Sequence, residues 1–197
     1  SLKEFSLFDQ IESTLIDPIY KKEDFVELDL SVDNHDLKNV NIASSNDLKK
    51  YIDAYIEKNQ AKVAYGGYLE KRNIYKRSSY FKGNVQNIPE RDIHLGVDIW
   101  QKEGTTVIAP LDGEIHSYKN NLNHGDYGPT IILKHTIGEN WFFTLYGHLS
   151  SSSILNLKIG QKINRGEVLA HFGNSQENGD YPPHLHFQII FDIENYF

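Results

Sequence analysis

The stretch Pro182–Ile190, which reads PPHLHFQII, combines two histidines with a run of strand-forming residues. In an extended strand successive side chains point to opposite faces. His184 and His186 therefore share one face, and the other face is apolar. Two imidazoles at neighbouring positions of one face can converge on a metal ion. Taken alone, the stretch fits equally well a half-buried strand with two incidental histidines.

A second stretch with the same alternation, HLGVDI at His94–Ile99, favours the metal-site interpretation. Its apolar side chains point toward a core, and His94, Gly96 and Asp98 lie on the opposite face. Because Gly96 has no side chain, His94 and Asp98 can reach a common ion. Two histidines and one aspartate suit zinc, and three protein ligands leave a fourth position open for water. Such a donor set is typical of a catalytic site rather than a structural one.

A third histidine motif, LYGHLS at Leu145–Ser150, follows a run of aromatic and β-branched residues at Trp141–Tyr146. This run predicts a buried strand that ends at Gly147. His148 is therefore expected at the end of a strand, a common position for functional residues.

In this order, the motifs HLGVD, LYGHLS and HLHFQ resemble those of the lysostaphin/LytM-type zinc endopeptidases. The pattern of that family is a His-x-x-x-Asp, a His ahead of a small loop, and a His-x-His. The resemblance covers residues 91–190, and further family-like segments such as GTTVIAPLDGEIHSY lie between the motifs. Three ordered motifs are far more specific than any one of them.

The resemblance implies a division of the site residues into two classes. The family's metal ligands fall on His94, Asp98 and His186, which would hold one zinc ion per chain. Its non-ligand catalytic histidines fall on His148 and His184. The implied reaction is hydrolysis of a peptide bond in peptidoglycan stem or cross-bridge peptides by zinc-activated water, whose pKa falls to about 7. The two histidines would stabilise the oxyanion and protonate the leaving amine.

The segment before the His-x-His motif departs from the family pattern. Relatives often have a Ser/Thr-Gly-rich loop there, whereas this chain has Gly173–Pro183, with an Asn-Gly pair and two prolines. These residues predict a fixed loop at the rim of the cleft, which bears on substrate preference rather than on the chemistry. The segments HLGVDIW and NGDYPPHLHFQ also resemble those of a sub-branch of this family that occurs as one domain of larger intracellular proteins.

Other polar and aromatic residues receive a structural interpretation. His124 and Asp126 are weaker candidates for the cleft, and Tyr127 and Tyr146 are candidates for substrate binding, although core packing is the preferred interpretation of both tyrosines. Surface or packing positions are predicted for five histidines, His35, His116, His124, His135 and His171, because none has a partner on its own strand face.

Composition bounds the function of the 197-residue chain, which has 39% hydrophobic residues and a mean hydropathy of -0.51. No apolar run approaches the ~20 residues of a membrane span. The formal net charge of -7 argues against nucleic-acid binding, which requires a basic face. The absence of cysteine excludes disulfides and thiolate ligands.

The sequence is compatible with two cellular locations. The N-terminus has no basic-then-apolar signal, yet the absence of an initiator methionine is compatible with a removed leader. We expect an extracytoplasmic protein if a leader was removed, and a cytoplasmic protein otherwise.

The apolar pattern predicts a mainly β fold, α+β overall. Residues 62–197 are expected to form an antiparallel β-sheet peptidase domain, preceded by a partly helical extension at residues 1–61. Within the extension, Phe25–Leu30 predicts a short strand and Ser1–Ile16 a helix.

The clearest helical pattern is SNDLKKYIDAYIEKN at residues 45–59, with apolar side chains at i, i+3 and i+4 behind a Ser-Asn-Asp cap. Its apolar residues Leu48, Ile52 and Tyr55 should pack on the β domain, because an exposed stripe of this length favours aggregation.

Two other classes of protein compete with the peptidase. The segments VIAPLDGEI and IGQKINRGEVLAHFG resemble the halves of biotinyl and lipoyl carrier domains, but a modifiable lysine in the characteristic context is missing. The second alternative is a catalytically inactive peptidase fold that serves as a binding or regulatory module. The loss of a ligand would be its signature, and all the ligand positions are filled.

Overall fold

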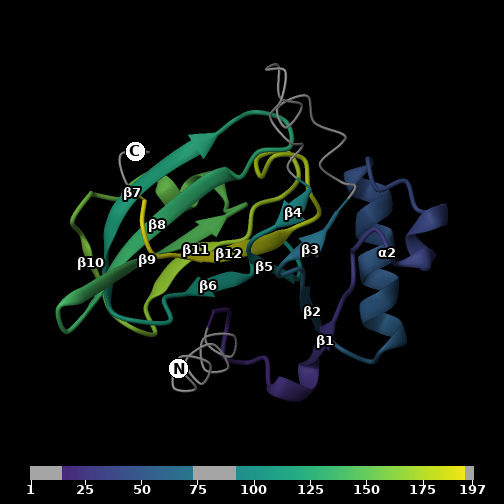
Figure 1. Ribbon diagram of the computed structural model, residues 1–197, viewed down its shortest axis with the longest axis horizontal. Coiled ribbons are helices and arrows are strands. Elements are labelled where there is room, and N and C mark those ends of the chain that lie inside the picture. Colours follow the sequence, from purple (N-terminus) through teal and green to yellow (C-terminus); the bar gives the residue numbers. More distant parts are fainter. Residues whose placement is uncertain (1–14, 73–91, 194–197) are drawn as a thin grey trace.

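The computed structural model describes residues 15–72 and 92–193. Its main element is a large sheet (Figure 1). In spatial order the eight strands are β1 (Phe25–Glu27), β2 (Val63–Gly66), β5 (Val97–Trp100), β12 (His184–Ile190), β9 (Asn140–Gly147), β8 (Gly128–Ile137), β7 (Gly113–Asn121) and β10 (Lys162–Ile163). Neighbouring strands are antiparallel except for β1 and β2, which run parallel. The predicted mainly β, antiparallel fold is confirmed.

Smaller elements complete the described part of the chain. Two strand pairs are β6 (Thr106–Ile108) with β11 (Val168–His171), and β3 (Glu70–Lys71) with β4 (Ile93–His94). The helices are α2 (Ser45–Lys58) and the short 3₁₀ turns η1 (Lys22–Asp24), η2 (His35–Asn39) and η4 (Ser151–Ile154).

Away from the hairpin that joins them, the long strands β8 and β9 are largely buried on both faces. Ile131 and Leu133 point into the main core, where they join Val107 of the small β6–β11 pair. Ile132, between them in sequence, points to the opposite face and packs with Phe143 in a second cluster. Because successive side chains of a strand point to opposite faces, the same strand contributes apolar side chains to two separate layers.

The helix predicted at residues 45–59 is present as α2. Its N-cap residue Ser44 accepts a hydrogen bond from the Asp47 amide at 3.2 Å. Leu48 and Ile52 are buried with Trp100 of β5, at the end of the sheet formed by β1 and β2 (Figure 1). Tyr55 is only half-buried, and its hydroxyl donates to the Glu27 carbonyl at 3.1 Å.

The residues before α2 are part of the same core and sheet. Leu15 and Ile16 are buried in the main core, and Ile16 bridges Val107 of β6. The predicted strand at Phe25–Leu30 is shorter than expected and ends at Glu27 as β1. Most of the helix predicted at Ser1–Ile16 lies outside the described residues. The division of the chain at residues 61 and 62 stays a prediction.

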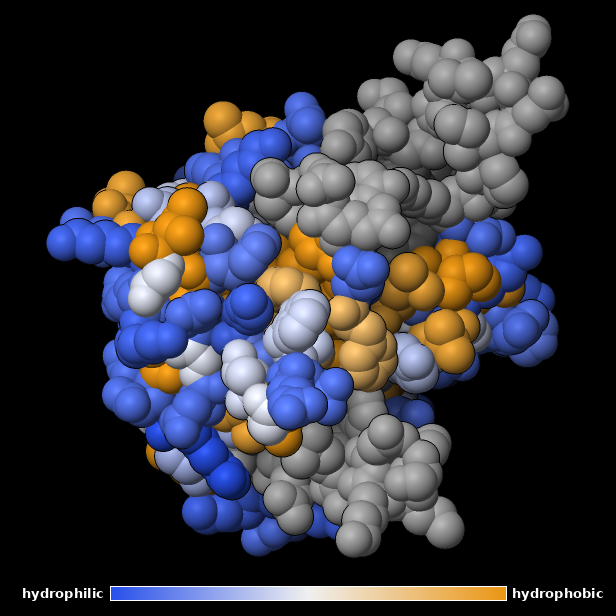
Figure 2. All heavy atoms as spheres, turned by 60° about the vertical axis from the view of Figure 1, so that its left-hand side comes forward, coloured by the Kyte–Doolittle hydropathy of each residue, from blue (hydrophilic) through white to orange (hydrophobic). Residues whose placement is uncertain are grey.

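The surface is mixed in character. Figure 2 shows one face, on which hydrophobic residues lie interspersed among hydrophilic ones. Within residues 15–72 and 92–193, no helix is both long and apolar enough to cross a membrane.

Candidate metal centre

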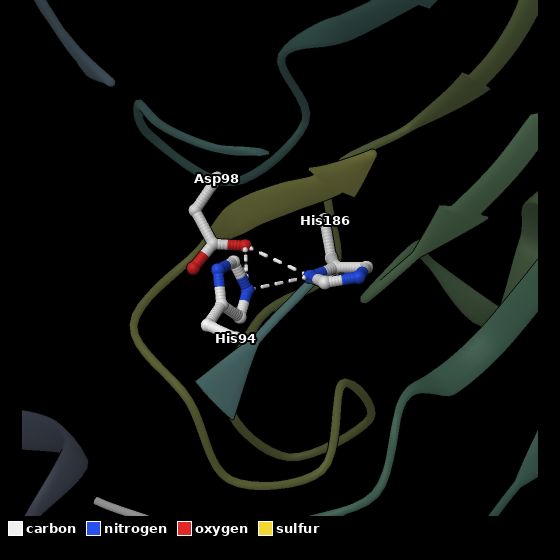
Figure 3. Close-up of side chains that lie close together, drawn as sticks. All are labelled: His94, Asp98 and His186. Carbon is white, nitrogen blue, oxygen red and sulfur yellow. Dashed lines mark hydrogen bonds and ion pairs between the residues drawn. The ribbon is translucent and has the colours of Figure 1, made fainter. Parts of the chain in front are cut away.

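The three predicted metal ligands converge from three strands (Figure 3). His94 ends β4, Asp98 lies in β5 and His186 lies in β12, where it stands directly opposite Asp98. His94 Nε2 lies 2.9 Å from His186 Nδ1 and 3.2 Å from Asp98 Oδ1. His186 Nδ1 lies 3.1 Å from the same carboxylate oxygen. All three side chains are buried.

The spacing of these atoms fits a small cation. Ligand atoms bound to one tetrahedral zinc ion at about 2.0–2.2 Å are about 3.3–3.6 Å apart. The three observed distances of 2.9, 3.1 and 3.2 Å are shorter by only a few tenths of an ångström. Two imidazole nitrogens and one carboxylate oxygen also match the donor preference of zinc. Among the described residues, no other group of three or more such side chains could hold a metal ion.

Gly96 provides the space that this arrangement needs. A Cβ atom at this position would lie 2.5 Å from Cε1 and 2.6 Å from Nε2 of His186. The sequence predicts a gap between His94 and Asp98, and the structure places the ring of His186 against that gap. The absence of a side chain at Gly96 therefore makes room for the His186 ring from the distant strand.

Hydrogen bonds fix the orientation of the first two ligands. The Nδ1–H of His94 donates to the Gly67 carbonyl at 2.8 Å, which leaves the lone pair on Nε2 directed at the centre. Arg72 Nη1 donates to Oδ2 of Asp98 at 2.6 Å, and its Nε–H donates to Glu70. Sequence reasoning missed Gly67, Glu70 and Arg72, which lie in a polar stretch without a motif.

The charges around Asp98 keep it ionised. Burial alone would raise the pKa of this carboxyl group, but the neighbouring His94, the guanidinium of Arg72 and His186 together outweigh burial. The pKa of Asp98 is therefore held well below its usual range, and the group is anionic at neutral pH.

The two predicted catalytic histidines lie side by side next to the ligands. The ring centroids of His148 and His184 are 4.2 Å apart. The sheet order explains this, because β12 lies between β5 and β9 and pairs His186 with Gly147, the residue before His148. His148 has a positive φ of 61°, so the chain turns out of β9 at this residue.

Both histidines have the same tautomer. The Nδ1–H of His148 donates to the Asn178 carbonyl, and that of His184 donates to the Pro182 carbonyl, each at 2.7 Å. The lone pair of each ring is therefore on Nε2. In His184 this atom lies 3.8 Å from Oδ1 of Asp98, so it faces the ligand cluster.

Burial keeps these two imidazoles neutral. Desolvation lowers the pKa of His148 well below its usual value, and the neighbouring His184 lowers it further. Desolvation also lowers the pKa of His184, to about 4, although the charge of Asp98 acts in the opposite direction. A neutral imidazole with a free Nε2 can accept a proton.

Aromatic side chains surround the histidines. Tyr181 is edge-on to His148, with ring centroids 4.9 Å apart, and Trp100 stacks on His184 at 5.9 Å. Tyr127 is half-buried, and its ring lies 4.9 Å from that of His186. Core packing is thus the wrong interpretation of Tyr127, which borders the site.

Core packing is the right interpretation of Tyr146. Its side chain is fully buried, and desolvation raises the pKa of its hydroxyl well above the usual value. The tyrosine lies in the main core with Phe187, whose ring centroid is 5.4 Å away.

The remaining histidines lie outside the ligand cluster. His35 and His171 are exposed, and His116 is half-buried in β7. His135 is buried and hydrogen-bonded through both ring nitrogens, at 2.8 Å to the Asp112 carbonyl and at 2.7 Å to the Thr144 hydroxyl. These positions agree with the predicted packing and surface roles.

The two weaker cleft candidates also stay out of the ligand cluster. His124 is exposed, and its Nε2 lies 3.1 Å from Oδ2 of Asp180. Asp126 is buried and accepts a hydrogen bond from the Tyr127 amide at 2.7 Å.

Asn178 organises the loop at residues 173–183. Its buried side chain donates to the carbonyls of Gly173 and Tyr181, at 3.2 and 3.1 Å, and accepts from the Tyr181 amide at 3.0 Å. Asp180 accepts a hydrogen bond from the Ser45 hydroxyl of α2 at 2.6 Å. These bonds support the predicted fixed loop, and the Asn178 carbonyl is the group that orients His148.

Comparison with known proteins gives partial matches of limited length. An uncharacterized metalloprotease of Haemophilus influenzae is 38% identical over 96 residues, which are 49% of this chain and 18% of the relative. The DD-carboxypeptidase/endopeptidase Mpg of Neisseria meningitidis is 32% identical over 96 residues, which are 49% of this chain and 20% of that protein. The matched part thus spans about a fifth of these relatives.

A solved structure and a family model also match part of this chain. The catalytic domain of lysostaphin from Staphylococcus simulans has a TM-score of 0.43 and 27% identity, over 57% of this chain and 77% of that one. The model of Peptidase family M23 matches residues 92–195, more than half of the chain, including all five predicted site residues. The predicted resemblance to lysostaphin-type peptidases is confirmed, and this chain belongs to peptidase family M23.

Proposed function

We propose that this protein is a zinc-dependent endopeptidase that hydrolyses peptide bonds in peptidoglycan stem or cross-bridge peptides. The observation that carries the proposal is the buried cluster of His94 Nε2, Asp98 Oδ1 and His186 Nδ1, with two further neutral histidines beside it. The family assignment supports a peptidase and removes the carrier-domain alternative.

The ligand set supplies one part of the chemistry. A zinc ion held by His94, Asp98 and His186 would provide a Lewis acid and a nucleophilic water at neutral pH. The protein contributes the orientation of these ligands, through the Gly67 carbonyl and the Arg72 guanidinium. Burial of the cluster strengthens each of these electrostatic contacts.

His148 and His184 supply the proton transfers. With Nδ1–H held by a backbone carbonyl, each imidazole keeps Nε2 as a proton acceptor. One of them can take a proton from the attacking water and return it to the leaving amine. The other, once protonated on Nε2, can donate a hydrogen bond to the oxyanion of the tetrahedral intermediate and stabilise it. The low pKa values keep both rings neutral before substrate binds.

The substrate class is supported by the relatives. A Neisseria relative is named a DD-carboxypeptidase/endopeptidase, and the lysostaphin domain is described as an antimicrobial peptidase. We extend a peptidoglycan peptide substrate to this chain as part of the proposal.

The test combines metal analysis with product analysis. The purified protein should contain about one zinc per chain, measured by elemental mass spectrometry. It should be incubated with purified muropeptides, with oligoglycine and with peptides that contain D-amino acids, and the products identified by mass spectrometry. Cleavage should stop when a chelator removes the metal and return when zinc is added back.

The possible outcomes separate the alternatives. A protein that holds no zinc and takes up none would contradict the enzyme assignment. A protein that holds zinc and binds muropeptides but cleaves none of the substrates would instead be a binding or regulatory module. Cleavage of an unrelated unfolded protein alone would support the peptidase and reject the substrate class.

A further inference from the structure

A segment that precedes the family match contacts two of the proposed metal ligands. This segment, residues 63–72, comprises β2, a turn and β3, and the match begins only at residue 92. Its turn supplies the Gly67 carbonyl that accepts from His94, and its end supplies Arg72, which donates to Asp98. The turn tolerates no side chain at Gly67, because a Cβ atom there would lie 2.2 Å from Nη2 of Arg72.

Arg72 is held firmly at this position. Only 5% of the residue is exposed, and its Nη1–H donates to Oδ2 of Asp98 at 2.6 Å while its Nε–H donates to Glu70. Its guanidinium carbon lies 5.7 Å from the ring centroid of Trp100. Its backbone amide donates to the Asp92 carbonyl at 2.7 Å. The planar guanidinium group of Arg72 therefore joins the carboxylates of Asp98 and Glu70 in one fixed geometry, which a lysine side chain cannot do.

Glu70 extends the contact toward the start of the chain. One of its carboxylate oxygens binds Arg72, and the other accepts a hydrogen bond from the Leu30 amide at 2.9 Å. The side chain is nearly buried, with 11% exposed. A continuous set of contacts therefore runs from Leu30 through Glu70 and Arg72 to Asp98.

We propose that Arg72 is a positioning residue for the metal centre. By occupying Oδ2 of Asp98, it leaves Oδ1 as the oxygen that faces His94 and His186, so the carboxylate binds the ion through one atom. Glu70 fixes the guanidinium in turn. This inference rests on the proposed function, because it assumes that these three ligands hold the metal.

The test compares two variants of Arg72 with a matched control at the adjacent residue. Lys71 also pairs with an aspartate, Asp92 at 3.0 Å, but its side chain is 60% exposed and lies outside the centre. The variants are Arg72→Gln, Arg72→Lys and Lys71→Gln. Zinc affinity is measured by competition with a chromophoric chelator, and the ligand geometry by the visible absorption spectrum of the cobalt(II)-substituted protein.

The expected results differ among the three variants. Arg72→Gln should weaken zinc binding by about 10–100-fold, the usual effect of losing a group that orients a ligand. Its cobalt bands should change in intensity, because Oδ2 of Asp98 becomes free to bind. Arg72→Lys should show the same changes to a smaller extent. Lys71→Gln should match the wild type in both measurements.

A double variant separates positioning from charge balance. Arg72→Gln with Glu70→Gln removes one positive and one negative charge, and the glutamine oxygen can still accept from Leu30. If Arg72 only balances the charge of Glu70, the double variant should recover the affinity and spectrum of the wild type, which would overturn the inference. Positioning predicts that both stay altered.

The remaining outcomes distinguish this inference from the proposed function. A wild-type protein without metal affinity contradicts the proposed function. A wild-type protein that binds zinc, with an Arg72→Gln variant of equal affinity and identical cobalt spectrum, contradicts the positioning role alone. If Arg72→Gln does not fold, as judged by circular dichroism, Arg72→Lys decides the question, and wild-type behaviour of that variant rejects the role of the guanidinium fork.

Discussion

His184 and His186 lie on the same face of one strand, yet their rings are held differently. In His184, Nδ1 is engaged by the Pro182 carbonyl at 2.7 Å. In His186, Nδ1 lies 2.9 Å from Nε2 of His94 and faces the ligand cluster. The alternation of the sequence cannot distinguish the two residues, because it specifies a face and not the atom that each ring presents.

This difference leads to a prediction for four variants. Asp98→Ala and His186→Ala each remove a ligand, so zinc should be lost or bound much more weakly, together with activity. His148→Ala and His184→Ala leave the ligand set whole. They should keep the zinc while turnover falls by about 10²–10⁴, the usual effect of losing a positioned acid or base. Zinc content and turnover are measured on the same preparations.

The control for these variants is His171→Ala, an exposed histidine of β11. It should retain both zinc and activity. If His184→Ala empties the site while His186→Ala keeps its metal, the two roles are reversed. Retention of zinc and full activity by all four variants would show that none of these side chains takes part in the reaction.

At the scale of one element, the loop at residues 173–183 holds His148 in place through Asn178. Asn178→Ala removes three hydrogen bonds within the loop and leaves buried backbone groups unpaired. Stability should therefore fall by about 1–3 kcal/mol. Turnover should fall as well, with zinc content unchanged, because the loop carbonyl that orients His148 becomes mobile.

The measurements for this variant are urea unfolding, steady-state kinetics and zinc analysis. Gln176→Ala, an exposed position of the same loop, is the matched control and should behave as the wild type. If Asn178→Ala lowers the stability but leaves turnover unaltered, the prediction that the loop orients His148 for the reaction is wrong.

Local pattern predicted several elements and missed their long-range partners. Residues 45–59 carry a cap and a 3.6-residue period, and both depend only on near neighbours, so α2 could be predicted. The parallel pairing of β1 with β2 depends on residues 38 positions apart, Phe25 with Val63, and leaves no local signal. Arg72 was missed for the same reason, since its partner Asp98 lies 26 residues away.

At the scale of the whole molecule, the N-terminal residues are expected to be essential for folding. Leu15, Leu28 and Leu48 are each no more than 2% exposed, and β1 forms one edge of the large sheet. Removal of residues 1–61 should therefore strongly destabilise the protein. Each buried leucine contributes roughly 2–5 kcal/mol.

A single substitution gives a graded version of this test. Leu48→Ala should lower the free energy of unfolding by roughly 2–5 kcal/mol. Lys49→Ala, on the exposed side of α2, should have little effect. Both are measured by urea unfolding. A chain that starts at Lys62 and proves as stable as the 197-residue chain would contradict the expectation.

The buried histidines make the stability of the metal-free protein depend on pH. The folded-state pKa of His184 is lowered to about 4, whereas an unfolded histidine has a value near 6.5. Between these values the unfolded chain binds more protons, so stability falls as the pH decreases from about 6.5 to about 4. His184 alone contributes about 3 kcal/mol to this fall. His148, His186 and His135 act in the same direction.

Asp98 adds a separate loss at lower pH. Its folded-state pKa is lowered, so its contribution to stability is complete above the usual value and disappears only below pH 4. Urea unfolding of chelator-treated protein at a series of pH values measures both effects. His184→Asn should flatten the curve between pH 4 and 6.5. A wild-type curve without slope in that range would contradict the prediction.

The contacts of residues 63–72 also concern how the family M23 part of this chain could be transplanted into another protein. A graft cut at the limits of the family match would carry His94 and Asp98 into a new host but leave behind the Gly67 carbonyl and the Arg72 guanidinium that hold them. Any recipient would have to offer a carbonyl and a cation at equivalent places. The structural unit that holds His94 and Asp98 in this chain is therefore larger than the part matched by the family model, and it includes residues 63–72.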